Sequence, residues 1–295
     1  MAKTKGKSII TETPVWLITG CSTGFGHEIA KHVLALGYHA VVTARHPDQV
    51  KDLPTTVEDL VLALDVTDKA QIQAAIKAAE DKYGRIDVLI DNAGIGYFAA
   101  VEEGEDEEVR RMFEINVFGL AHMVQAVLPG MRRLGKGTIV NISSIGGLTS
   151  LPSLGYYNAT KFAVEGLSGA LRQEVEPLGI KVMVVEPSGF RTDWAGRSAN
   201  GSKHQIDAYA KSSGAVREYI RANSGKQAGD PVRAARAIVN AVDSGNPPHH
   251  LLLGNDAYQS AMANLEELRT EFSSSETISR GADFPKEKAG VLAAR

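Results

Sequence analysis

Tyr157 and Lys161 are the two residues whose types and spacing point most directly to chemistry. Side chains four positions apart on a helix lie on one face, so the phenol and the ammonium can reach the same point. A cation beside a phenol favours the phenolate, and we expect Lys161 to lower the pKa of Tyr157 from about 10 towards neutrality. Such a phenol exchanges protons at neutral pH, so the pair predicts an acid/base catalyst. Ser144 lies thirteen positions before the tyrosine.

The elements that must position this pair begin with a nucleotide-binding pattern. Residues 15–19 are a short apolar run that predicts a buried strand, and residues 27–37 have the apolar spacing of a helix. Between them lies a glycine-rich turn, and residues 39–43 predict a second strand. This βαβ unit is typical of dinucleotide binding. Gly20 allows the tight turn, Gly24 and Gly26 allow close approach of the pyrophosphate, and the helix N-terminus faces the phosphate charge.

Strands and helices continue to alternate along the rest of the chain. Further strands are predicted over residues 60–64, 86–90, 137–142, 180–185 and 250–253, and helices over 68–83, 109–134, 156–178 and from 230. Unbroken alternation predicts an α/β fold with a single doubly wound parallel sheet (Rossmann-type) and helices on both faces. We expect a flexible N-terminal tail (1–13), one catalytic domain (14–271) and a polar C-terminal tail (272–295).

Composition predicts a cytoplasmic enzyme without a metal. The net charge of the 295 residues is −3, which gives no basic field for nucleic acid. No apolar run reaches the roughly 18 residues of a membrane span, and the first residues lack the apolar core of a signal peptide. The single cysteine, Cys21, excludes an internal disulfide and a cysteine-based metal site. The eight histidines show no ligand spacing, and His249 and His250 are expected to point apart on a strand.

Seven short motifs follow one another between about residues 15 and 192: Thr19 to Gly26, Asp65-Val66, Asp91 to Gly94, Asn116, Asn141 to Ser144, Tyr157 to Lys161, and Glu186-Pro187. In this order they resemble those of the short-chain dehydrogenase/reductase family of the ordinary-length type. The start of the glycine turn is also loosely similar to the hydroxysteroid and retinol dehydrogenase branch.

The resemblance implies roles for particular residues. Ser144, Tyr157 and Lys161 would be catalytic: the serine donates a hydrogen bond to a substrate oxygen, and the lysine also binds the nicotinamide ribose. Asn116 would hold a water in a proton relay with Lys161; the alternative is a buried polar group satisfied by the core. The implied cofactor-binding residues are Gly20, Ser22, Thr23, Gly24, Phe25, Gly26, Arg45, Asp65, Val66, Asn92, Ala93, Gly94, Tyr157, Lys161, Pro187, Gly189 and Thr192. Two positions depart from the family pattern: Asp91 replaces the usual asparagine, and Ser188 separates Pro187 from Gly189.

The end of the second predicted strand indicates which cofactor is preferred. A carboxylate about 20 residues after the glycine turn would accept the ribose hydroxyls of NAD. The family position of that carboxylate is Ala44 here, and Arg45 follows it. An arginine fits the 2′-phosphate of NADP by a bidentate contact, so we predict NADP. A plain surface arginine is the alternative, and Asp65 is either an adenine neighbour or a strand-end and capping residue.

Residues 194–229 predict a lid over the substrate. The segment is long for a connection in an α/β fold, yet it carries several large apolar side chains and helical spacing over residues 208–222. It follows the sixth strand, at the sheet edge where such folds bind ligands. An ordinary surface excursion is the alternative. The pocket below would be lined by apolar residues, which favours an apolar ketone over a sugar: Tyr97, Phe98, Leu148, Leu154, Phe190 and Trp194.

Together these patterns predict an NADP-dependent oxidoreductase that transfers a hydride between NADPH and a ketone or aldehyde, or a secondary alcohol in reverse. Two alternatives stay open: an NADPH-binding redox sensor without turnover, and a sugar-nucleotide epimerase or dehydratase. By resemblance, the helices over residues 109–134 and 156–178 would pack a homodimer or homotetramer. The expected partner is a small carbonyl or alcohol substrate, without nucleic acid or a membrane span.

Overall fold

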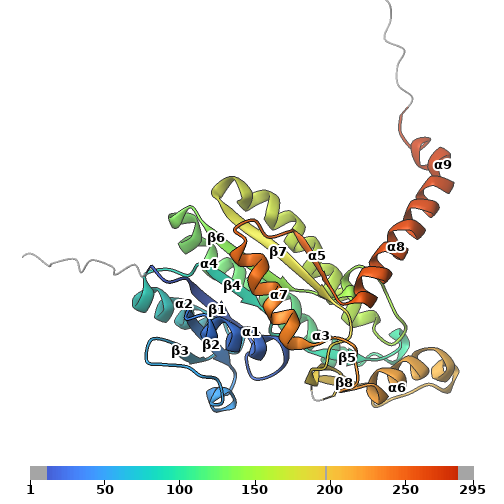
Figure 1. The fold of residues 1–295 in the computed structure, drawn as a ribbon. Helices are drawn as coiled ribbons and strands as arrows, with labels where there is room; N and C mark the ends of the chain where they lie inside the picture. Colours follow the sequence, from blue (N-terminus) through green and yellow to red (C-terminus); the bar gives the residue numbers. More distant parts are fainter. Residues whose placement is uncertain (1–11, 197, 285–295) are drawn as a thin grey trace, which may run out of the picture.

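Seven parallel strands form the central sheet of the computed structural model, which describes residues 12–196 and 198–284 (Figure 1). Their order across the sheet is β3-β2-β1-β4-β6-β7-β9. This confirms the predicted doubly wound parallel sheet. The strands are β1 Val15–Ile18, β2 His39–Ala44, β3 Leu60–Ala63, β4 Val88–Asp91, β6 Gly137–Ile142, β7 Ile180–Pro187 and β9 His250–Leu253.

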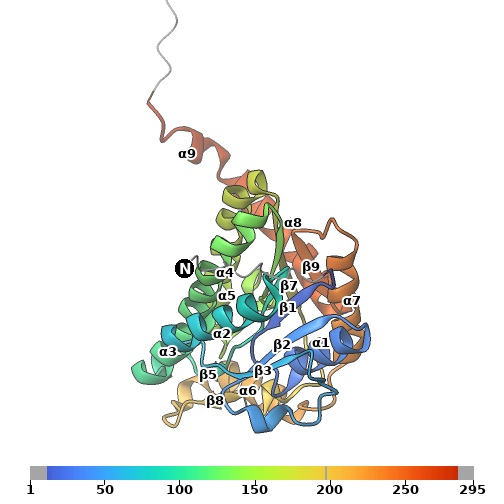
Figure 2. The same cartoon turned by 90° about the vertical axis from the view of Figure 1, so that its left-hand side faces the viewer.

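Helices cover both faces of the sheet because its strands are apolar on both sides. Trp16 and Ile18 of β1 pack on one face with α1 (Gly24–Ala35) and α7 (Pro231–Asp243). Val15 and Leu17, which alternate with them, pack on the other face. That second face is covered by α2 (Lys69–Tyr83), α4 (Leu120–Leu134) and α5 (Gly155–Val175) (Figure 2).

The direction in which successive strands are added to the sheet reverses beside β1. Leu17 of β1 lies opposite Val41 of β2 on one side and Leu89 of β4 on the other. The connections from β1 and β4 therefore leave the sheet in opposite directions. Open α/β sheets bind ligands at the carboxyl ends of strands that flank such a switch point.

Shorter elements complete the structure. A two-stranded sheet joins β5 (Gly96–Phe98) to β8 (Ala199–Gly201), and the sequence analysis missed it. The predicted helix over 109–134 begins earlier, as α3 (Asp106–Phe113), and reaches α4 through a π-helical turn, η3 (Glu114–Gly119). The remaining short helices are η1 Pro47–Val50, η2 Val101–Glu103, η4 Ile145–Gly147, η5 Glu176–Leu178, η6 Asp193–Ala195, η7 Asp207–Tyr209, η8 Ala210–Gly214 and α6 Ala215–Ala222.

The expected start of the polar C-terminal tail at residue 272 lies inside a helix in the part that the structure describes. Helix α8 (Asn255–Ser274) crosses that boundary, and α9 (Glu276–Arg280) follows it. Both project from the body of the fold in Figure 1. The sequence analysis missed α8 because its Ser-rich end obscures the helical pattern. The predicted tail segments 1–11 and 285–295 lie outside the described residues.

The continuous helix Asp106–Leu134 is, by length and composition, apolar enough to cross a membrane. Its most apolar window is 44% buried within the protein. Met123, Val127 and Met131 of this helix belong to the core on the α2/α4/α5 face. We therefore interpret it as a core helix that forms one layer of the fold.

Candidate active site

The glycine turn after β1 has the conformation and close contacts that the sequence predicted. Gly20 and Gly24 have φ angles of +70° and +62°, which side chains rarely adopt. A Cβ on Gly26 would lie 2.4 Å from both the Gly20 carbonyl oxygen and the Asn92 amide nitrogen. Within the described part of the chain, the Thr23 side chain makes no capping bond to α1. The first amides of α1 are therefore open to an anion such as a phosphate.

Thr19 and Asn92 join the carboxyl ends of β1 and β4. The Asn92 side chain donates to the carbonyl oxygens of Thr19 and Gly20 at 2.9 and 3.0 Å. The Thr19 hydroxyl accepts from the amides of Asn92 and Ala93 at 2.9 and 3.0 Å. The sequence analysis gave Thr19 no role of its own. The signal was a hydroxyl residue at the end of an otherwise apolar strand.

Ser144, Tyr157 and Lys161 meet at the carboxyl edge of β6. The Lys161 ammonium donates to the Ile142 carbonyl oxygen at 2.8 Å and lies 5.7 Å from the centre of the Tyr157 ring. The Ser144 hydroxyl accepts from the Gly146 amide at 3.0 Å and hydrogen-bonds to Tyr157. The structure thus brings together the three residues that the resemblance named as catalytic.

Burial sets the protonation of this pair. It raises the pKa of Tyr157 to about 12, although the hydrogen bond with Ser144 lowers it. Burial also lowers the pKa of Lys161 to about 8, against the opposing charge of Glu165. The expected fall in the pKa of Tyr157 was therefore wrong for this structure, because desolvation of the phenolate outweighs its stabilisation. At neutral pH the phenol keeps its proton, which is the state needed to donate one.

Asn116 has its side chain committed to the protein. Its oxygen accepts from the Ile95 amide at 2.9 Å, while its nitrogen donates to the Ile95 carbonyl at 2.9 Å and to Thr160 at 3.2 Å. The residue lies in the π-helical turn η3, a feature often found at functional sites. Its side chain therefore joins α5 to the strand end after β4, and its role in a water relay stays a prediction.

The other predicted cofactor residues surround the same edge. Arg45 is exposed directly after β2 and has no ion-pair partner among the described residues, whereas Ala44 is buried. Asp65 accepts from the Thr67 amide at 2.9 Å, and the cap of α2 is Asp68 instead. Other members lie beside glycines of this region: a Cβ added to Gly119 would meet Val66, one on Gly94 would meet Asn116, and one on Gly24 would meet Thr192.

Asp91 has a carboxyl oxygen without a hydrogen-bond partner among the described residues. Its carboxyl group is buried. Burial raises the pKa of Asp91 well above its usual value. The departure from the family's asparagine therefore places a carboxyl group where burial disfavours its charged form.

Trp194 forms an apolar wall against the ring of Tyr157. Its ring centre lies 4.9 Å from that of Tyr157 and 5.6 Å from that of Phe98. Phe98 and Tyr97 are fully buried below this wall, so they support the predicted pocket without lining it. Leu154 lies in the same cluster, and Leu148 is half-buried in the loop after η4.

The expected position of Phe190 in this pocket was wrong. Its ring packs edge-on against Phe25, with ring centres 5.0 Å apart, in the core cluster of the α1/α7 face. It lines a separate surface hollow with Arg191 and Leu253. The spacing after β7 could not show to which side the chain turns.

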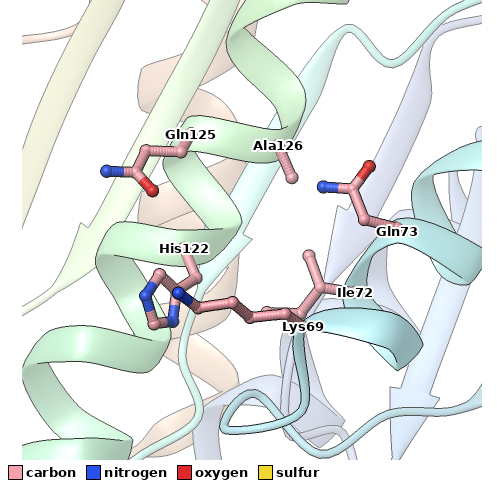
Figure 3. A pocket seen from close by; sticks show the side chains of 6 residues that line it. All are labelled: Lys69, Ile72, Gln73, His122, Gln125 and Ala126. Atoms are coloured by element: carbon pink, nitrogen blue, oxygen red, sulfur yellow. The ribbon is translucent and has the colours of Figure 1, made fainter.

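A small hollow between α2 and α4 lies apart from these residues (Figure 3). Its lining contains none of the predicted site residues. It consists of Lys69, Ile72, Gln73, His122, Gln125 and Ala126.

The segment from Trp194 to Gly229 is tied to the rest of the protein at several points. Glu103 and Arg217 form a buried ion pair with a separation of 3.2 Å. Glu103 also accepts from the Ile206 amide at 2.9 Å. Burial raises the pKa of Glu103, but hydrogen bonds from Ile206, Ala100 and Arg217 outweigh it and leave the pKa below its usual value. The ionised Glu103 therefore stabilises the segment fully at pH values above the pKa that this side chain has in the unfolded chain. The stabilisation is lost as the pH falls through the lower pKa of the folded state.

Glu103→Gln is expected to loosen this segment. Removing one charge of a buried ion pair costs about 3–5 kcal/mol, so trypsin should cleave at least about tenfold faster here. The segment offers exposed trypsin sites at Lys203, Lys211, Arg221 and Lys226. The exposed Glu107→Gln is the matched control and should cleave like the wild type. Equal cleavage of both variants would show that the ion pair does not restrain the segment.

Comparisons with known proteins agree with this geometry. The family model described as short chain dehydrogenase matches residues 14–203. Oxidoreductase BOA17 of Botryotinia fuckeliana is 39% identical over 87% of this chain and 94% of its own length. The 3-ketodihydrosphingosine reductase of Bacteroides thetaiotaomicron is 37% identical over 81% of this chain and 87% of its own.

Solved structures share the fold, and two of those described here hold nicotinamide cofactors. A short-chain dehydrogenase from Streptomyces avermitilis has a TM-score of 0.86 and 41% identity, covering 92% of this chain and all of its own. ElxO, solved with NADP, has a TM-score of 0.69 and 27% identity over 84% of this chain and 99% of its own. A 3-ketoacyl-(acyl-carrier-protein) reductase from Brucella melitensis, solved with NADH, has a TM-score of 0.68 and 26% identity over 81% and 95%.

Proposed function

The chain belongs to the short-chain dehydrogenase/reductase family of oxidoreductases, and we propose that it reduces an apolar ketone or aldehyde with NADPH. The observation that carries the proposal is the meeting of Ser144, Tyr157 and Lys161 beside the Trp194 ring. A neutral phenol, a hydroxyl donor and an ammonium at one point are the groups that a carbonyl needs when it becomes an alcohol.

The residues of the glycine turn and the start of α1 fit a nicotinamide dinucleotide. A Cβ on Gly26 would fill the space beside the Gly20 carbonyl, and the uncapped amides of α1 suit a pyrophosphate. The bound cofactor would supply the hydride, while the protein orients it and the substrate. Lys161 has donors left after its bond to Ile142, and we assign them to the nicotinamide ribose.

Proton transfer falls to the chain's own side chains. Tyr157 donates its phenolic proton to the carbonyl oxygen, and the raised pKa of the buried phenol keeps that proton available at pH 7. Ser144, oriented by the Gly146 amide, donates a hydrogen bond to the same oxygen and stabilises its developing charge. The Lys161 ammonium offsets negative charge on Tyr157 after the transfer.

Preference for NADP rests on Arg45, which is exposed at the end of β2 beside the buried Ala44. Ala44→Asp with Arg45→Ala should shift preference towards NADH by about ten- to a hundredfold, because hydrogen bonds to a charged group contribute about 1.5–3 kcal/mol. The measurement is kcat/KM for each cofactor with one ketone. Wild type that uses NADH as efficiently as NADPH would contradict the assignment.

An apolar ketone is favoured by the Trp194 wall, which Phe98 supports from below. The name of 3-ketodihydrosphingosine reductase, a relative, also specifies a keto substrate. The test is a panel of aliphatic, aromatic, steroid and sugar carbonyls with NADPH. Apolar ketones should have the highest kcat/KM, and a clear preference for sugars would overturn the substrate class.

We also propose that residues 194–229 act as a lid and that the chain forms a homodimer or homotetramer. Trp194 connects the segment to Tyr157, and Glu103–Arg217 anchors its far part. NADPH with a ketone should slow tryptic cleavage of the segment; equal cleavage with and without them would contradict a lid.

The proposed homodimer or homotetramer rests on exposed apolar side chains. Phe118, Phe162 and Leu167 are roughly half exposed on η3 and α5, which favours assembly through these helices. Light scattering measures the mass in solution, and a monomer would contradict the assembly.

A further inference from the structure

Glu165, Glu186 and His250 form a cluster that the proposed reaction does not use. They come from α5, β7 and β9, and one ligand atom from each lies within 4.8 Å of the others. The His250 Nδ1 atom is 2.6 Å from Glu186 Oε1 and 3.8 Å from Glu165 Oε2. Rigid elements therefore hold two carboxylates and one imidazole around a common point.

The two carboxylates are buried without sufficient partners. The side chain of Glu186 is 0% exposed and that of Glu165 is 11% exposed, whereas His250 is 52% exposed. Within the described residues, Glu186 Oε2 has no hydrogen-bond partner. Neither Glu165 oxygen has a hydrogen bond of good geometry, although the nearby Ser143 hydroxyl favours its charged form. Buried carboxylates are usually paired with a cation or bound to a metal.

We propose that Glu165, Glu186 and His250 bind one divalent transition-metal ion, of which zinc fits best. Two carboxylate oxygens and one imidazole nitrogen are common zinc ligands, and an imidazole disfavours magnesium or calcium. Zinc bonds of about 2.0–2.2 Å place neighbouring ligand atoms roughly 3.4 Å apart in a tetrahedral site, so the His250 Nδ1 atom must move away from Glu186 Oε1 and towards Glu165 Oε2. His250 can make this movement because it is half-exposed, and water can complete the coordination from the same side.

A glycine lies beside Glu165 in this cluster. A Cβ on Gly147 would lie 2.7 Å from the Ser143 hydroxyl and 2.9 Å from Glu165 Oε1, so a larger residue there would displace these side chains. Glu165 also lies one helical turn after Lys161 on α5. A bound cation would therefore neutralise the negative charge of Glu165, which otherwise acts on the Lys161 ammonium.

The test is calorimetric titration of the untagged, chelator-treated chain with zinc chloride. We expect one zinc per chain, with X-ray absorption showing only nitrogen and oxygen ligands. Glu186→Gln and His250→Ala should each weaken binding by about a hundredfold or more, since losing even an outer partner of a ligand costs 10–100-fold. The exposed His204→Ala is the control and should bind zinc like the wild type.

Two results would overturn the proposal. One is the absence of stoichiometric zinc binding by the wild type. The other is unchanged zinc affinity in Glu186→Gln and His250→Ala, which would place the ion elsewhere. A cooperative thermal unfolding transition is the check that both variants are folded. If Glu186→Gln does not fold, the test rests on His250→Ala, whose side chain is half-exposed in the wild type. If Glu186→Gln is more stable than the wild type above pH 7 and the wild type binds no zinc, a shared proton occupies the cluster instead.

Discussion

Tyr157→Phe is expected to lower kcat for ketone reduction by about 10²–10⁴-fold, the range that a positioned general acid contributes. The substitution removes only the hydroxyl group and leaves the ring that packs against Trp194. Binding of NADPH should therefore stay close to that of the wild type. Stopped-flow measurement of NADPH fluorescence and steady-state turnover separate the two effects.

Tyr156→Phe is the matched control for this prediction. Its hydroxyl donates to the Val101 carbonyl oxygen at 2.7 Å, away from the Lys161 ammonium. Loss of that bond should cost about 1 kcal/mol of stability and leave turnover nearly unchanged. If Tyr157→Phe retains the wild-type rate across the pH range, Tyr157 is not the acid.

Gly26→Ala is the second substitution with a large expected effect. The added methyl group would lie 2.4 Å from the Gly20 carbonyl oxygen and 2.4 Å from the Asn92 side chain. Because the first of these is backbone, the glycine turn itself must shift, at a typical cost of about 1–3 kcal/mol. We expect NADPH binding to weaken by at least about tenfold, which corresponds to 1.4 kcal/mol. Calorimetric titration with NADPH measures it.

Gly166→Ala provides the control for this glycine. It lies in α5, where an added Cβ meets nothing within 4 Å. Alanine in a helix is favoured over glycine by about 0.5–1 kcal/mol, so this variant should be slightly more stable and bind NADPH normally. Wild-type affinity in Gly26→Ala would show that the cofactor does not approach this turn.

Local patterns in the sequence were sufficient to predict much of the fold. The apolar run before Gly20 and the helical spacing after Gly26 each depend on nearby residues, and together they predicted the βαβ unit correctly. The spacing of Tyr157 and Lys161 likewise placed both side chains on one helix face. These features are determined within a few residues of chain, so periodicity was enough.

Properties that depend on tertiary packing were not predictable in this way. The rise in the pKa of Tyr157 comes from burial by residues distant in sequence, among them Trp194. The cluster of Glu165, Glu186 and His250 was missed because these residues have no local spacing, and only the packing of α5 on the neighbouring strands β7 and β9 brings them together. His249 and His250 were expected to point apart, yet their rings are 4.4 Å apart because His249 precedes β9.

Hydride transfer is the central claim, and isotope transfer measures it most directly. NADPH carrying deuterium at the hydride-donating carbon is mixed with the protein and the best ketone of the panel, and the product is analysed by NMR. We predict one deuterium on the carbinol carbon of the alcohol, with its loss in Tyr157→Phe. Tight binding of NADPH without its oxidation by any carbonyl compound of the panel would contradict the account. That result would indicate a redox sensor without turnover.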